Sequence, residues 1–186
     1  MIAKITRVLT LPPVVTGLTI ILMAQIGRLE STAEFMVLIG CLVVFPLLAY
    51  PFREIFKINT DRRQGQRSVA MVFSAISYSY GFIWAMFNTS SMIAKVFFSS
   101  YLISIVGLLI VNKIIGYHAS GHACSTTAPL VLLSWQMGYW YLLIGLALVI
   151  SVYYASLHLK RHTIFQLLSG SSISVLAGIV SIIIYI

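Results

Sequence analysis

Long uncharged stretches alternate with short polar segments along this chain. About 20 apolar residues are needed to cross a bilayer core of roughly 30 Å, and the uncharged stretches reach that length. We expect membrane-spanning helices at residues 8–27, 35–52, 68–87, 96–111 and 163–186, with two more inside 119–159. The last tract divides near Gln136 and Gly138, where three consecutive aromatic residues indicate an interfacial turn. The pattern therefore predicts an all-α, polytopic membrane bundle of about seven helices.

Composition supports the same class. Hydrophobic residues make up 60% of the 186 residues, charged residues only 9%, and the mean hydropathy is +1.00. A soluble domain of this length has too little interior to bury so much apolar surface. We expect one integral membrane domain over residues 1–186, embedded in the bilayer and without a nucleic-acid partner.

Two local features bear on processing and on metal binding. Lys4 and Arg7 resemble a charged leader, but the Pro12-Pro13 pair and the lack of a small-residue cleavage site favour a retained first helix. Cys41 and Cys124 are isolated, so we expect them to be packing residues rather than parts of a disulfide or a zinc site. No metal and no cofactor is predicted.

Three polar segments fall on one side of the predicted bundle. Residues 53–67, 113–122 and 158–162 are each separated from the next by two helices, so all three emerge at the same membrane surface. Basic residues also gather there, which favours an anion-binding site at the interface. Since Lys and Arg collect in cytoplasmic loops, the same asymmetry predicts a cell-membrane protein whose site faces the cytoplasm.

Short motifs in these segments resemble those of the type 2 phosphatidic acid phosphatase superfamily. Ser120-Gly121-His122 matches the second motif. In the third, His162 and Gly170 match, whereas Ser156 stands where the family has Arg and Gln166 stands where it has Asp.

The first motif departs further. The family has a Lys followed by Arg-Pro, whereas residues 61–68 here are Arg-rich and lack both that Lys spacing and the Pro. The chain looks closest to divergent membrane branches with Arg-rich first motifs and an Arg-His-Thr third motif. The resemblance implies a six-helix phosphatase core, here with a possible extra helix.

The resemblance also implies roles for particular residues. His162 would attack phosphorus, His122 would protonate the leaving alkoxide with His118 as the competing candidate, and Gln166 would orient the His162 ring. The expected substrate is a membrane lipid phosphate or an isoprenoid (di)phosphate, cleaved without a metal. Seven residues are expected to bind the phosphate: Arg62, Arg63, Arg67, Lys113, Ser120, Gly121 and Arg161.

Other interpretations stay open at this point. The same fold could carry a lipid phosphotransferase, or a non-catalytic protein such as a pseudoenzyme or a small transporter. Histidines near helix ends can be plain interfacial residues, and the run of arginines can be a topology determinant. A transporter is expected to place ionisable residues or broken helices near mid-membrane, whereas the charges here lie near one surface. The sequence leaves the oligomeric state open.

Overall fold

The computed structural model describes residues 6, 9–58, 61–88 and 90–186, and within them the chain forms helices joined by short loops. Several of the helices run on without a break, so that α3, η1 and α4 form one rod and α6 and η2 form another. The elements are α2 (Pro12–Gln25), α3 (Thr32–Ile39), η1 (Gly40–Val44), α4 (Phe45–Phe56), α5 (Arg62–Phe87), α6 (Met92–Leu109), η2 (Ile110–Ile114), α7 (Gly121–Met137), α8 (Tyr139–His158) and α9 (Ile164–Tyr185). The segments η1 and η2 are single π-helical turns. The predicted all-α class is confirmed for the described residues.

Within the described part of the chain, five rods are long and apolar enough to span a membrane. They are Thr32–Phe56, Gln64–Phe87, Met92–Ile114, Tyr139–His158 and Ile164–Tyr185. The helices α2 and α7 are shorter, with 14 and 17 residues. Large apolar side chains such as Leu143, Ile150 and Ile183 are more than half exposed, which a lipid environment accommodates and water does not.

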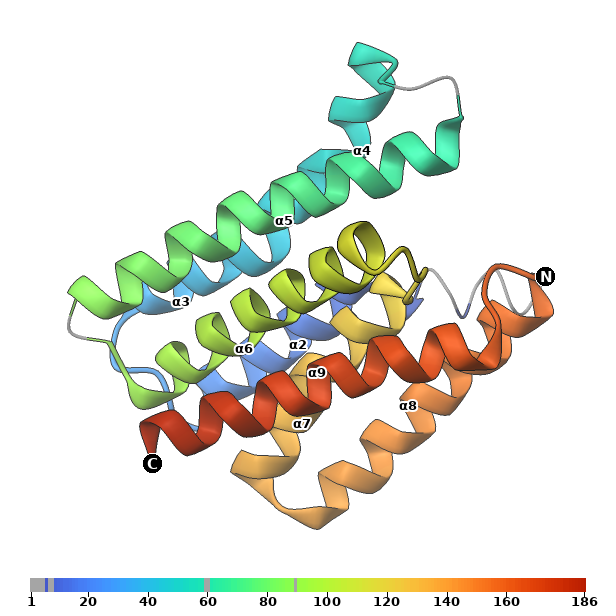
Figure 1. Ribbon diagram of the computed structural model, residues 1–186. Helices are drawn as coiled ribbons and strands as arrows, with labels where there is room; N and C mark the ends of the chain where they lie inside the picture. The colour runs from blue at the N-terminus through green and yellow to red at the C-terminus, as the bar shows by residue number, and fades with distance from the viewer. Residues whose placement is uncertain (1–5, 7–8, 59–60, 89) are drawn as a thin grey trace.

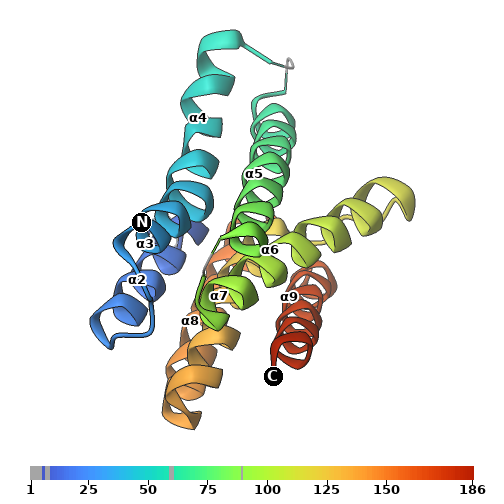
Figure 2. The ribbon, with the colours of Figure 1, turned by 90° about the vertical axis from the view of Figure 1, so that its left-hand side faces the viewer.

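The rod formed by α6 and η2 is the centre of the bundle. Some 61% of its most apolar segment is buried inside the protein, against 22% for α8 at the periphery. Phe97 and Phe98 of α6 are almost fully buried in the core. Figure 2 shows α2, α3 and α4 on one side of α5 and α6, with α9 on the other. The core therefore forms where α5, α7 and α9 pack around α6.

Successive rods alternate in direction, so the loops divide between two ends of the bundle. The loops from α4 to α5, from α6 to α7 and from α8 to α9 lie at one end, where α2 also begins (Figure 1). The other end holds the loops from α2 to α3, from α5 to α6 and from α7 to α8. We call the first the histidine end, because His118, His122, His158 and His162 all lie there, and the second the glutamate end, after the buried Glu34.

Candidate functional site

A cavity of about 740 Å³ opens at the histidine end. Three predicted catalytic histidines line it, together with cationic and polar residues from the starts of α5 and α7 and from the loop between α8 and α9. The predicted site residues in its wall are Arg67, His118, Gly121, His122, Arg161 and His162. Side chains separated by up to 95 positions in the sequence thus share one cavity.

The link between α8 and α9 is fixed at both of its ends. Lys160 has a positive φ of 49°, and the amides of Lys160 and Arg161 donate to the carbonyls of Leu157 (2.9 Å) and Ser156 (3.0 Å). This is the Schellman pattern that ends a helix. Thr163 then caps α9. Only Arg161 and His162 lie between the two caps, so both residues have a well-defined position.

Gln166 holds the ring of His162. Its Oε1 accepts from the Thr163 amide at 3.2 Å and lies 3.2 Å from His162 Nδ1. Because the Thr163 amide is a donor, the atom between the two groups is the Gln166 oxygen, and Nδ1 must carry the proton. His162 Nε2 then carries the lone pair. Gln166 therefore selects the tautomer in which Nε2 is the basic nitrogen.

The starts of α7 and α9 are joined through Ser120. Its amide donates to the Gln166 carbonyl at 2.8 Å, and its hydroxyl accepts from the Ala123 amide at 3.3 Å as the N-cap of α7. Gly170 allows this approach, because a Cβ there would collide with the Ser120 carbonyl oxygen. The second and third motifs are therefore physically connected, and the matching Gly170 has a packing role.

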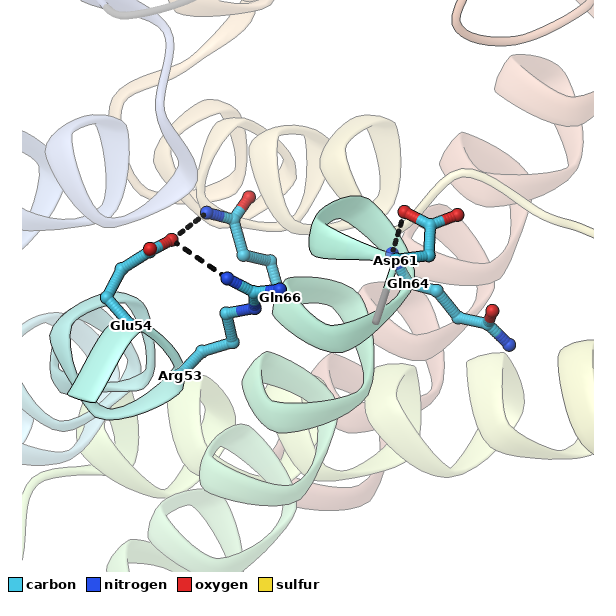
Figure 3. Close-up of polar contacts among 5 residues, drawn as sticks. All are labelled: Arg53, Glu54, Asp61, Gln64 and Gln66. Atoms are coloured by element: carbon cyan, nitrogen blue, oxygen red, sulfur yellow. Dashed lines mark hydrogen bonds and ion pairs between the residues drawn. The ribbon is translucent and has the colours of Figure 1, made fainter. Parts of the chain in front are cut away.

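Arg67 brings α5 to the same site. Its Nη2 donates to the Ala119 carbonyl at 3.1 Å, next to the capping Ser120. One position earlier, Gln66 points to α4 and donates to Glu54 at 3.3 Å, and Glu54 also pairs with Arg53 at 3.4 Å (Figure 3). Hence α4, α5 and the loop before α7 are tied together around the cavity.

Acidic and amide groups also occur at the cavity mouth. Asp61 and Gln64 both line it, and the Asp61 carboxylate accepts a hydrogen bond from the backbone N–H of Gln64 at 3.3 Å. In Figure 3, the Asp61 and Gln64 side chains lie apart from the contacts between Glu54 and Gln66. The first motif thus contributes one acidic residue, Asp61, to a wall whose other described charged residues are Arg67 and Arg161.

The cavity continues from this mouth into the bundle. On α5 its wall runs from Gln64 to Tyr78, a length of about 21 Å at 1.5 Å per residue. Its inner wall includes Tyr101, whose hydroxyl bonds Thr16 of α2 at 2.7 Å. Apolar residues such as Leu108 lie between the mouth and this inner end. The space is therefore amphipathic, with charges at the mouth and mostly apolar walls below.

Several predicted residues lie elsewhere. Ser120 is fully buried and caps α7, and Lys113 is exposed on η2; neither is in the cavity wall as described. Gln166 acts behind His162 rather than on the wall. The side chains of Arg62 and Arg63 fall outside the described residues.

The departures of the third motif have local explanations. Ser156 is buried in α8 and contributes its carbonyl to the helix end, which leaves the nearby positive charge to Arg161. At the other departure, Gln166 contacts the His162 ring through a neutral amide oxygen.

Sequence reasoning missed several parts of the cavity, among them Leu42, Pro46 and Tyr50 of the rod formed by α3, η1 and α4. The start of α2, including Pro12 and Thr16, forms part of the wall. Asn112, just past the expected end of the span at 111, is also a wall residue. The signal that could have found it is an uncharged amide at the end of a strongly apolar stretch.

Among the described residues, no group of three or more His, Cys, Asp or Glu side chains is placed to hold a metal ion. Cys41 and Cys124 are both buried as free thiols in the core. Compared with protein-family models, curated proteins and solved structures, the chain matches none of them.

Proposed function

We propose that this protein is a membrane phosphohydrolase that removes phosphate from a lipid phosphate through a phosphohistidine on His162. The observation that carries the proposal is the cavity at the histidine end, where His118, His122 and His162 meet Arg67 and Arg161. Cations suit a phosphate group, and neutral imidazole is a competent nucleophile near neutral pH. The apolar walls below suit the hydrocarbon part of an amphiphile.

In the first step, Nε2 of His162 attacks phosphorus and the bond between phosphorus and the lipid oxygen breaks. The contact from Nδ1 to Gln166 prepares this step, because it leaves the lone pair on Nε2. Protonated His122 gives its proton to the leaving alkoxide, which departs as an alcohol. His162 then carries the phosphoryl group.

In the second step, neutral His122 takes a proton from water, and the resulting hydroxide attacks phosphorus. The bond from phosphorus to His162 breaks, inorganic phosphate leaves, and both histidines return to their starting protonation states. Arg67 and Arg161 stabilise the equatorial oxygens in both steps.

We further propose that the chain crosses the membrane seven times and that the cavity opens at the cytoplasmic surface. Arg53, Lys57, Lys113 and Lys160 lie at the histidine end in addition to the two wall arginines, whereas Arg28 and Lys95 lie at the glutamate end. The positive-inside rule then assigns the histidine end to the cytoplasm. A reporter fused after Ile186 should be found outside the cell, and a cytoplasmic signal would reverse the orientation.

The test is phosphate release by the detergent-purified protein from phosphatidate, phosphatidylglycerophosphate and isoprenyl phosphates, with and without chelator. We expect release that resists the chelator and is lost in His162→Ala, together with a labelled phosphoenzyme that the variant does not form. The matched control is His158→Ala. His158 is exposed on the last turn of α8, stacks on Tyr154 with ring centroids 5.8 Å apart, and is not in the cavity wall as described.

Equal release by wild type and His162→Ala would contradict the proposal. If no lipid is hydrolysed, adding an alcohol acceptor tests the phosphotransferase, and failure of both reactions would favour a non-catalytic protein.

A further inference from the structure

Asn112 carries a buried amide in the wall of the cavity. The residue is 8% exposed, and neither its Nδ2 nor its Oδ1 has a hydrogen-bond partner among the residues that the structure describes. Leaving a carboxamide unpaired in a protein interior is unfavourable, because it loses its bonds to water without replacement. Such a group in a cavity wall suggests that a ligand supplies the missing bonds.

The position of Asn112 is specific. It lies on the π-helical turn η2, and single π-helical turns of this kind occur frequently at functional sites. On the same rod, Tyr101, Ile105 and Leu108 line the cavity toward its inner end, while His118 and Gly121 follow Asn112 at the mouth. Asn112 therefore lies where the charged mouth changes to apolar wall.

We propose that Asn112 binds an oxygen-bearing group next to the substrate phosphate, and so selects glycerol-based lipid phosphates over isoprenyl phosphates. This inference rests on the proposed function of the cavity. A carboxamide can donate two hydrogen bonds and also accept. A glycerolipid phosphate offers ester oxygens a few bonds from phosphorus, whereas an isoprenyl phosphate offers only hydrocarbon there. The isoprenyl ligand would leave the amide unpaired, and sites built for hydrogen bonds discriminate strongly against such analogues.

The test compares how tightly two soluble ligands, dioctanoyl phosphatidate and farnesyl phosphate, bind to the Asn112→Leu variant and to the protein that keeps Asn112. Binding is measured by calorimetry in a His162→Ala background, so that neither ligand is consumed. We expect the preference for phosphatidate to fall by about tenfold or more in Asn112→Leu, with farnesyl phosphate binding changed by less than about threefold. Turnover of both ligands by Asn112→Leu alone should show the same change in the ratio of kcat/KM.

The control is Asn88→Leu, which replaces an exposed asparagine at the glutamate end and should leave the preference unchanged. The inference would be overturned if Asn112→Leu lowered the affinity for both ligands equally or for neither. It would also be overturned if the parent protein preferred neither ligand.

The two proposals fail separately. A preference that depends on Asn112 in a protein that releases no phosphate supports this inference and rejects hydrolysis. Hydrolysis that depends on His162, with a substrate preference that does not depend on Asn112, supports the phosphohydrolase and rejects this inference.

Discussion

The two ends of the bundle both contain polar residues among apolar helices, but they use them differently. At the glutamate end, Glu34 is fully buried and accepts from the Ser91 amide (2.8 Å), the Ser91 hydroxyl and the Glu30 amide (2.6 Å). These bonds join the start of α3 to the start of α6. At the histidine end, His122 and Arg67 line a cavity instead.

The difference separates polar groups whose hydrogen bonds join helices from polar groups that line a cavity. Glu34 has its bonding capacity taken up by caps and loop amides, which is a structural use of a buried carboxyl group. Around the cavity, the residues that hold the site, Ser120 and Gln166, are distinct from the histidines that they position. Stability and activity should therefore respond to substitutions at different ends.

The largest expected effect is a loss of activity at the histidine end. His122→Ala should lower the rate of lipid phosphate hydrolysis by about 10²–10⁴-fold, the usual contribution of a general acid or base, and leave the melting temperature unchanged. His118→Ala should cost less than about tenfold, because His118 lies on an exposed loop and His122 on the first turn of α7.

A substrate whose leaving group needs no proton tests whether His122 acts as a general acid or only supports the structure. With p-nitrophenyl phosphate, formation of the phosphoenzyme by His122→Ala should recover relative to the lipid substrate, because nitrophenolate departs unprotonated. The same deficit with both substrates would argue that His122 has a structural role and would weaken the contrast between the two ends.

The next effect is a loss of stability at the glutamate end. Glu34→Ala removes the acceptor of two buried Ser91 donors and of the Glu30 amide, so it should destabilise the protein by about 3 kcal/mol. Thermal unfolding in detergent measures the change, and phosphate release per folded molecule should stay near the wild-type value. Glu30→Ala is the matched control, since this neighbouring glutamate side chain is exposed. A folded Glu34→Ala protein without activity would contradict the division between the ends.

Much of the helical pattern could be predicted from the sequence, because lipid imposes a simple rule on length and polarity. The expected stretches overlap described helices, and loop parity correctly grouped His118, His122 and His162 at one end. The π-helical turns at Gly40–Val44 and Ile110–Ile114 could not be predicted, since the length of an apolar stretch does not distinguish a π-helical turn from an α-helical one.

The candidate site was less predictable, because it depends on side-chain direction. The motif resemblance predicted that Ser120 binds the phosphate, yet its hydroxyl is engaged in capping α7. It gave no reason to associate α2 with the site, since a Pro12-Pro13 start and an apolar helix carry no chemical signal. Asn112 was missed for the opposite reason: a single amide next to a charged residue looks like the end of a span.

The smallest effect, at Gln166, tests how the histidine end works with a neutral amide behind the His162 ring. Gln166→Leu removes the acceptor of His162 Nδ1 and of the Thr163 amide, so kcat should fall by about 10–100-fold, as for other partners that orient a reactive histidine. Gln166→Glu keeps an acceptor and adds charge, which stabilises a protonated Nδ1 when Nε2 bonds to phosphorus, and should retain or raise kcat. Gln136→Leu, at the last turn of α7, is the control and should have no effect. If Gln166→Glu were as slow as Gln166→Leu, the capping of α9 and not the tautomer of His162 would be what Gln166 provides.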